Sequence, residues 1–347
     1  MNYSKVLPIN ESPLVGFLRW PYTLSITATE EKTIQWFYSN FIQVFVNKHY
    51  YENKSEFNFN FFRGRQYEFY NNPFLITTRL GNDILRNITN DIVDFYIECI
   101  NLGYYVVAFI DEYYIHNKPT FKKNHLPHHL LIFGYNLHEK VFYTYGFNNE
   151  MQFVTSLIPF DEIAVAYNSI EKLLSNGELK DNPDNSNFLL KFNENHNYVF
   201  DKNAVSKQIY EYLNSKSNVG YLNYNNDNNV FGLETYNYLK QYYERILDGT
   251  DVHKGGFLRS LHVLWEHKKL MLERINYLAK NNIITTDNNE LYNKFKGIEE
   301  EVLNMRNSAI KYNITNDVSY IINIIETFET IKLREEAELK RLLDALN

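Results

Sequence analysis

Apolar side chains recur at helical spacing in two early segments of the chain. In residues 30–47 they repeat every three or four positions, behind a threonine and two glutamates that suit a first helical turn. The apolar positions are Ile34, Phe37, Phe41, Val44 and Phe45. Residues 90–102 repeat the pattern, and Gly103 supplies a stop signal. The spacing predicts a helix over each segment.

Four short apolar runs then follow closely, at residues 104–110, 129–135, 140–145 and 151–155. They have the length and composition of strands, and a hairpin is the simplest connection between the second and the third. Pro159 then opens a further helical pattern. Helices followed by consecutive antiparallel strands predict an α+β fold, because alternating βαβ units are not seen.

The amino-acid composition of the chain changes past residue 175. Polar, asparagine-rich connectors come first, and long segments with helical apolar spacing follow. These segments are residues 232–247, 256–280, 289–312 and 316–345. They predict a bundle of long helices. The pattern therefore divides the chain into an α+β domain at residues 1–172 and a helical domain at residues 173–347.

Length and charge narrow the class of protein. The 347 residues are 44% hydrophobic, which is enough for two packed units, and the formal net charge is −7. That charge argues against a partner with a phosphate backbone, so nucleic acid is not expected. No basic segment leads into an apolar signal region, and no apolar run reaches the length of a membrane span. We expect a soluble, cytoplasmic protein with no membrane partner.

The chain has one cysteine, Cys99, which excludes an intrachain disulfide and a cysteine-rich zinc site. Cys99 falls on the apolar face of the 90–102 helix near its C-terminal end, where the helix dipole opposes a thiolate. This position favours a core residue over a nucleophile that pairs with a histidine. A loose group of histidines follows, at His116, His125, His128, His129 and His138. Their irregular spacing matches no metal motif, so neither a metal nor a cofactor is expected.

Two adjacent histidines stand at the head of the run "HHLLIFGY". A histidine at the start of a strand, upstream of Gly134-Tyr135 and a hairpin, is the arrangement that seats the general base of papain-like cysteine peptidases. Neighbouring strand residues point to opposite faces, so only one of His128 and His129 can face a cleft. The spacing favours His128.

Longer stretches extend this likeness. The segment "GYYVVAFIDEYYIHNKPTFKKNHLPHHLLIFGYNLHEKVFYTYGF", with "IQWFYSNFIQVF" before it and "RSLHVLWEHKKLMLERINYL" after it, resembles the butirosin biosynthesis protein H family. That family comprises papain-like proteins of nonribosomal peptide and other specialised-metabolite gene clusters. The resemblance covers most of residues 1–170, and it rests on the composition of these segments and on their order along the chain.

The resemblance implies a papain-like sheet and acyl or peptidyl transfer, or hydrolysis, on a thioester-tethered intermediate. A thiolate at the N-terminus of the first long helix would take the acyl group. A histidine would lower the pKa of the thiol, and an Asp or Asn would orient the imidazole. The implied partner is an acyl or peptidyl carrier protein or its pantetheine-bound substrate. Substrate, acceptor and oligomeric state stay open.

This sequence departs from the family pattern at two places. The stretch "WPYTLSITATEE" contains no cysteine, and Ser25 is the hydroxyl that stands nearest to that role. No acid stands on the second hairpin strand, where Thr144 and Gly146 occur, and Asn148 is the nearest replacement. Asp111, which closes the first strand, serves equally well as an orienting acid or as a turn former.

Three explanations fit these departures. In the first, the protein is a catalytically inactive homologue that binds or docks a carrier protein or biosynthetic enzyme. In the second, it is an enzyme that uses Ser25 or another hydroxyl. In the third, a catalytic cysteine has been replaced at Ser25 or Ala28. In each enzymatic version His128 is the base. His262, Glu266 and His267 lie on a predicted helix, and their position favours polar contacts between helices over a site.

Overall fold

The computed structural model describes residues 3–53, 55–62, 68–180, 182–217, 228–250, 256–284 and 288–347. It confirms an α+β fold with an antiparallel sheet and a C-terminal helical region. The chain forms two compact units, and each is discontinuous in sequence. The sheet unit comprises Met1–Thr33 and Tyr67–Asn197, and the helical unit comprises Ile34–Gln66 and Tyr198–Asn347.

The sheet unit is built on a seven-stranded sheet in which each paired strand is antiparallel to its neighbour. The order is β4 (Leu75–Leu80), β9 (Asn187–Phe192), β5 (Tyr105–Asp111), β6 (Pro127–Asn136), β7 (Val141–Phe147) and β8 (Phe153–Pro159), with β1 (Ser4–Val6) also paired to β6. The four strands predicted from the apolar runs are β5 to β8. Strands β1, β4 and β9 were not predicted, because each is short or lies in a polar stretch.

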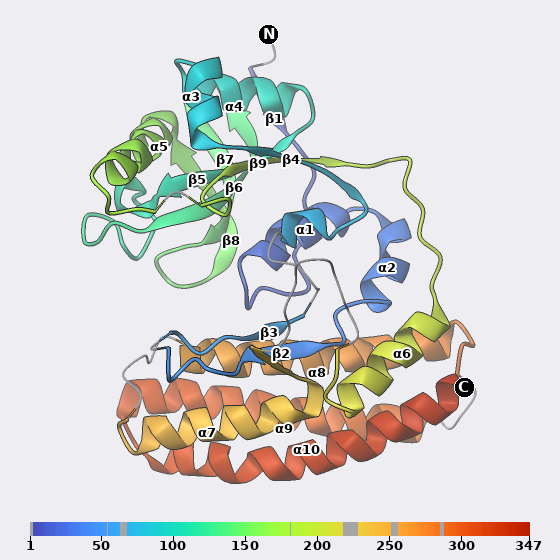
Figure 1. Ribbon diagram of the computed structural model, residues 1–347. Helices are drawn as coiled ribbons and strands as arrows, with labels where there is room; N and C mark the ends of the chain where they lie inside the picture. The colour runs from blue at the N-terminus through green and yellow to red at the C-terminus, as the bar shows by residue number, and fades with distance from the viewer. Residues whose placement is uncertain are drawn as a thin grey trace. The chain divides into compact units, whose positions relative to one another are not determined.

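The helices of this unit are α1 (Arg19–Thr27), α3 (Asn82–Ile88), α4 (Ile92–Asn101) and α5 (Phe160–Ser175), with 3-10 turns η1 (Glu31–Thr33), η2 (Glu68–Tyr70) and η3 (Glu112–Tyr114). Helices α4 and α5 contact each other and cover β5 (Figure 1). Helix α4 confirms its predicted limits: Asp91 caps it by accepting from two backbone N–H groups, and Gly103 ends it at φ 83°.

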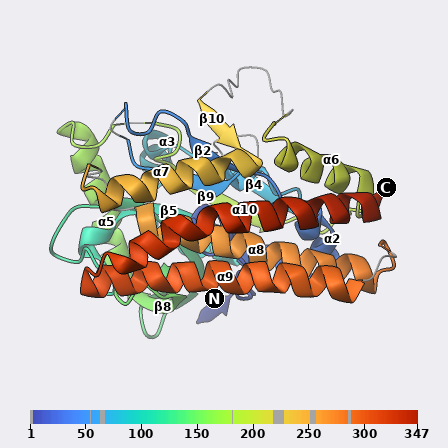
Figure 2. The ribbon, with the colours of Figure 1, turned by 90° about the horizontal axis from the view of Figure 1, so that it is seen from below.

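The helical unit carries a small three-stranded sheet beside its helices. The sheet order is β10 (Asn229–Phe231), β2 (Val44–Asn47) and β3 (Phe59–Phe61). The helices are α2 (Ile34–Tyr38), α6 (Lys202–Leu213), α7 (Thr235–Leu247), α8 (Phe257–Lys280), α9 (Asn288–Thr315) and α10 (Ser319–Leu346), with the 3-10 turn η4 (Gly232–Glu234). Helices α8, α9 and α10 run alongside one another (Figure 2), as the periodicity predicts.

The predicted helix over residues 30–47 is wrong beyond residue 38. Helix α2 ends at Tyr38, Phe41 adopts a left-handed φ of 58°, and Val44–Asn47 is strand β2. The apolar residues of this segment belong to two successive elements, α2 and β2. The second element is a strand because β3 and β10 supply its backbone hydrogen bonds.

The unit boundaries also differ from the division at residue 172 that the sequence pattern suggests. Residues 34–66 belong to the helical unit, and β9, which follows the polar linker, belongs to the sheet. Strand pairing over long sequence separations decides both assignments. Among the described helices, none combines the length and the apolar character that a bilayer crossing requires.

Candidate functional site

His129 is a core residue of the sheet unit. Its side chain is 7% exposed and contacts the rings of Phe69, Phe109 and Phe188. Its Nε2 lies 3.0 Å from the carbonyl oxygen of Ser186 and donates to it. Burial lowers the pKa of His129 to about 3, against the smaller opposing effect of that hydrogen bond. An imidazole held neutral inside an aromatic cage cannot exchange protons with a substrate.

His128 points to the opposite face, as strand alternation requires. Its side chain is 41% exposed, and its Nδ1 lies 3.1 Å from Oε1 of Glu112. Glu112 is itself buried, and the same oxygen lies 3.7 Å from Nζ of Lys118. Burial lowers the pKa of Lys118, while Glu112 partly restores it. His128 is therefore the accessible member of a small charged cluster.

Both carboxylate oxygens of Asp111 have polar partners. It is fully buried at the end of β5, and its Oδ1 accepts from the backbone N–H groups of Tyr113 at 3.2 Å and Leu126 at 3.0 Å. Its Oδ2 accepts from Oγ of Ser169 at 2.8 Å and lies 2.6 Å from Nδ1 of His125. Asp111 thus caps η3 and orients a histidine at the same time.

His125 is the imidazole that sequence reasoning missed. Its side chain is 44% exposed, and its ring stacks on Tyr113 at a centroid distance of 4.4 Å. An ionised carboxylate only accepts hydrogen bonds, so Asp111 fixes the proton on Nδ1 and leaves the Nε2 lone pair for solvent. The sequence does carry a signal for this pair of residues. An acid ends one strand, and a histidine-rich loop leads into the next strand.

Ser25 does not stand at a helix N-terminus. It lies in the last turn of α1, it is 0% exposed, and its Oγ donates to the carbonyl oxygen of Tyr22 at 3.2 Å. The helix dipole opposes an alkoxide at that end. In the described part of the chain, no hydrogen bond joins Ser25 to His128, His129 or His125. Ser25 was expected just before the first predicted helix, over residues 30–47, but it lies inside α1, a helix that the apolar pattern did not predict.

Asn148 shapes a turn. Its Oδ1 accepts from the backbone N–H groups of Glu150 and Gln152 at 3.0 and 2.9 Å, in the connection between β7 and β8. Gly146, where the resemblance implies an orienting acid, has little room: a Cβ there would lie 3.3 Å from Oη of Tyr22 and 3.4 Å from Nζ of Lys118. Among the described residues, no hydrogen bond joins Asn148 or Gly146 to an imidazole.

Cys99 lies on the buried face of α4 with 5% exposure. Burial raises the pKa of its thiol to about 11, and the nearby Glu98 adds to the shift. The thiol is therefore protonated at neutral pH, and a protonated, buried thiol is a poor nucleophile.

A third histidine repeats the arrangement of His125 and His128. His116 Nδ1 lies 2.9 Å from Oε2 of Glu162 on α5, and its side chain is 46% exposed. All three therefore bind a carboxylate through Nδ1 and face solvent with the rest of the ring. In the described ranges, no three His, Cys, Asp or Glu side chains come together closely enough to hold a metal ion.

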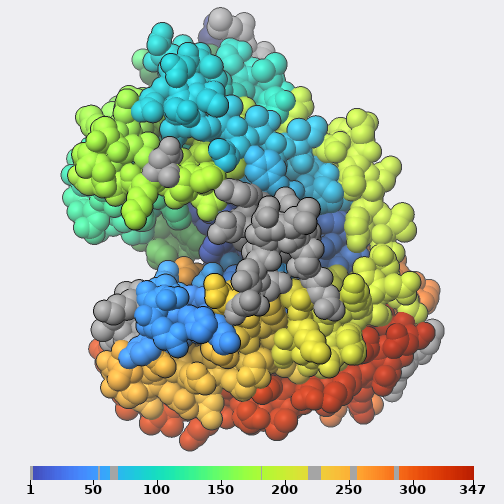
Figure 3. Space-filling model, in the orientation of Figure 1, coloured from blue at the N-terminus to red at the C-terminus, as the bar shows by residue number. Residues whose placement is uncertain are grey.

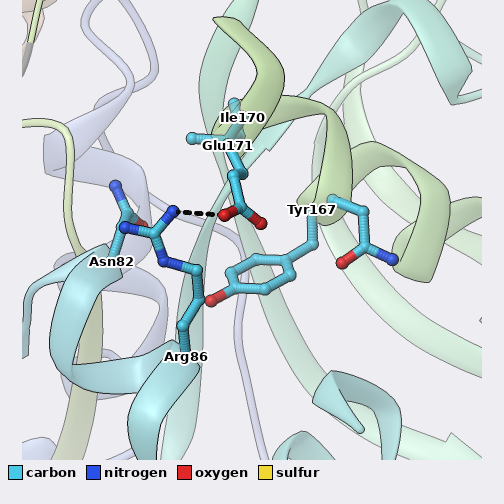
Figure 4. A pocket seen from close by; sticks show the side chains of 6 residues that line it. Asn82, Arg86, Tyr167, Ile170 and Glu171 are labelled. Carbon is cyan, nitrogen blue, oxygen red and sulfur yellow. Dashed lines mark ion pairs between the residues drawn. The ribbon is translucent and has the colours of Figure 1, made fainter. Parts of the chain in front are cut away.

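A small pocket lies between α3 and α5, both of which reach the surface in Figure 3. Its cavity volume is about 10 Å³, which is room for one water molecule rather than for an organic substrate. Figure 4 shows the Arg86–Glu171 ion pair at its edge, 3.0 Å long, and the Tyr167 hydroxyl pointing toward Arg86. This hydroxyl is buried without a protein partner, and burial raises its pKa to about 12.

One of the two histidines of α8, His262, makes the expected polar contact with another helix. His262 Nε2 lies 3.2 Å from Glu266, and Arg306 on α9 donates to His262 Nδ1 at 2.9 Å. His267 binds the carbonyl oxygen of Ile42 at 2.8 Å. Beside it, Nζ of Lys268 lies 2.5 Å from Glu335 on α10, and both side chains are 0% exposed. This ion pair joins helices and offers no access to a substrate.

Comparison with known proteins adds no family to this description. No protein-family model matches the sequence, and no curated protein matches it significantly. The geometry of the sheet unit therefore has to support any function on its own.

Proposed function

We propose that this protein transfers or hydrolyses acyl or peptidyl groups held as thioesters in specialised metabolism, with His125 as the general base. The observation that carries the proposal is the contact between Asp111 Oδ2 and His125 Nδ1 at 2.6 Å, in which the acid is fully buried and the imidazole is half exposed. A base held by an orienting acid is the arrangement that acyl-transfer enzymes use. The proposed setting is cytoplasmic, and the single cysteine of the chain is consistent with it.

The proposed chemistry has no covalent enzyme intermediate. Nε2 of His125 takes a proton from an amine or a water molecule, whose nitrogen or oxygen attacks the thioester carbonyl. The new C–N or C–O bond forms as the C–S bond breaks, and the imidazolium returns its proton to the departing thiolate. The buried positions of Ser25 and Cys99 favour this route over nucleophilic catalysis.

The test follows thiol release from acyl-pantetheine thioesters supplied with an amine. We expect the full-length protein to turn the thioester over and His125→Gln to lose about 10²-fold or more in rate, because a positioned general base contributes that much. His138→Gln is the matched control, since His138 is an exposed histidine on the turn between β6 and β7. Equal turnover by wild type and His125→Gln would remove the proposed base, and an acyl adduct on Ser25 in the intact mass would restore covalent catalysis.

A second candidate has a specific observation in its favour. Ser25 lies at the end of its helix where the dipole opposes an alkoxide, and burial raises the pKa of Cys99, so neither of these two candidate nucleophiles is activated. The protein would then be an inactive homologue that docks a carrier protein or a biosynthetic enzyme. Binding of an acyl-loaded carrier protein without any thiol release, in wild type and in His125→Gln alike, would select this candidate.

A further inference from the structure

β8 is the outermost strand on one side of the seven-stranded sheet (Figure 1). It comprises seven residues, Phe153–Pro159, and pairs with β7 along its whole length without a shift of register. The strand at the edge of a sheet has a row of backbone N–H and C=O groups that its one neighbour cannot reach, and such a row can bind a further strand. The residues of β8 that carry this row follow from its pairing with β7.

Every second residue of β8 directs its backbone groups away from β7. Opposite residues of two antiparallel strands alternate between pairs that exchange hydrogen bonds and pairs that do not. The ladder of β7 and β8 extends to a bonded pair just outside the strands, since the N–H of Asn148 donates to the carbonyl oxygen of Gln152 at 2.9 Å. Counting from this pair, Phe153, Thr155 and Leu157 direct N–H and C=O outward. Within the described ranges, no hydrogen bond joins these outward groups to another residue.

This edge lacks the features by which proteins keep edge strands from pairing, namely charged side chains, a central proline or a bulge. Residues 151–160 contain no charged side chain, and Pro159 is the last residue of the strand. Thr155 is exposed, and Leu157 is 46% exposed. The outward edge of β8 is therefore open, uncharged and partly apolar.

Strand β4, at the opposite end of the sheet, is better protected. It carries the exposed, charged side chain of Arg79, and it contacts the 3-10 turn η2. The hydroxyl group of Thr77 donates to the carbonyl oxygen of Phe69 in that turn at 2.8 Å. The two edges of one sheet thus differ, and β8 is the one whose composition suits a further strand.

We propose that β8 pairs with β8 of a second copy of this chain, in antiparallel orientation, with Ser156 at the two-fold axis. In this register Thr155 of each copy lies opposite the partner's Leu157, and the two residues exchange both of their outward hydrogen bonds. The same pair is a cross-strand contact between a β-branched side chain and a leucine on one face of the joined sheet. On the other face the two Ser156 hydroxyls meet and hydrogen-bond to each other.

The chemistry of the edge favours a second copy over a different protein. An antiparallel edge is complementary to itself, because a two-fold rotation brings each donor opposite an acceptor, and the contact then closes at two chains. Each copy has a net charge of −7, but residues 151–160 carry no charge, so no like charges meet in the contact. A charged strand of another protein would find no opposite charge there.

The size of the contact sets its strength. A seven-residue edge is roughly 24 Å long and about 10 Å deep, which gives about 240 Å² per copy. A standard stable interface covers about 800 Å² per partner. We therefore expect a reversible dimer with a dissociation constant on the order of 100 μM. Added salt should strengthen it by screening the repulsion between the two net charges.

Sedimentation equilibrium of the full-length protein tests this dimer from about 10 μM to about 1 mM, a range that brackets the expected dissociation constant. We expect the average mass to rise with concentration from that of one chain toward that of two. Leu157→Lys should raise the dissociation constant by about tenfold or more, because it places a charge on the edge that the partner strand approaches. Ile76→Lys is the matched control: Ile76 is 48% exposed on β4, and the exchange alters the net charge equally, so the dissociation constant should not change.

A thiol at the proposed axis tests the register. Cys99, the one cysteine of the chain, is buried, so Ser156→Cys adds the first thiol at the surface. The Cα atoms of a non-bonded antiparallel pair lie about 4.5 Å apart, which a disulfide can span. Mild oxidation of Ser156→Cys should give a linked dimer on a non-reducing gel. Thr78→Cys, at an exposed position of β4, should not.

The mass of a single chain at every concentration would overturn the proposal. Equal weakening by Leu157→Lys and Ile76→Lys would overturn it too, because net charge rather than β8 would then control association. Equal cross-linking of Ser156→Cys and Thr78→Cys would reduce the disulfide to random collision and overturn the register. Circular dichroism of each variant separates these outcomes from unfolding. Thioester turnover is not measured, so this test and that of the proposed function fail independently.

Discussion

At the scale of single residues, the two adjacent histidines differ because strand alternation sends them to opposite faces. His129 enters the aromatic cage of Phe69, Phe109 and Phe188, whereas His128 reaches solvent over Glu112. The sequence shows that only one of the two histidines can face a cleft, but it does not show which face of the strand is packed against the core. Nor could it pair His125 with Asp111, since that contact depends on the register that sets Asp111 opposite Pro127.

The lowered pKa of His129 makes a prediction about acid stability. Its pKa falls from 6.5 to about 3 on folding, so the unfolded chain binds more protons and the stability that neutral His129 contributes is lost as pH falls below about 6.5. Between about pH 6.5 and pH 5 this loss amounts to about 2 kcal/mol. Urea unfolding of His129→Phe should show a correspondingly flatter dependence on pH than wild type.

His138→Gln is the control for this experiment and should leave the slope unchanged. His267 has a pKa that burial also lowers, so part of the slope should survive in His129→Phe. Identical slopes for wild type and His129→Phe would mean that water reaches the aromatic cage and that His129 is accessible after all.

At the scale of elements, turns decide where helices and strands begin. Gly232 opens η4 with φ 54°, and a Cβ there would lie 2.1 Å from the carbonyl oxygen of Tyr212. This contact is with backbone and cannot be relieved by a rotamer change. It fixes the position of η4 against the end of α6.

We therefore expect Gly232→Ala to lower the free energy of unfolding by about 3 kcal/mol or more, because it combines left-handed strain with a backbone clash. Gly177→Ala is the matched control: its φ is 79°, and nothing lies within 4 Å of a Cβ there, so only the strain of about 1–2 kcal/mol remains. Thermal unfolding of both variants measures the difference. Similar losses in the two variants would argue against the close approach at Tyr212.

At the scale of the whole molecule, the two units share a chain that passes between them more than once. After the first helix of the sheet unit the chain enters the helical unit, to which residues 34–66 belong. It then returns to the sheet unit with residues 67–197. A cut at residue 172, where the sequence pattern places a boundary, would remove β9, which pairs with both β4 and β5.

A fragment of residues 1–172 should accordingly fail to form the complete sheet. The loss of β9 leaves the backbone groups of β4 without a partner and exposes an edge of β5, and unpaired edges promote aggregation. Circular dichroism and size-exclusion chromatography should show less strand and more aggregate than for residues 1–197, which keep β9. Equal behaviour of the two fragments would show that β9 is dispensable.

Sequence pattern alone determined α4, α5, the long helices α7 to α10 and the strands β5 to β8, because each of these elements carries its own periodicity or apolar run. Tertiary structure decided the rest. Val44–Asn47 reads as part of a helix, and it is a strand only because β3 and β10 supply its hydrogen bonds. The carboxylate partners of His116, His125 and His128 likewise come from other elements, so no spacing along the chain could encode them.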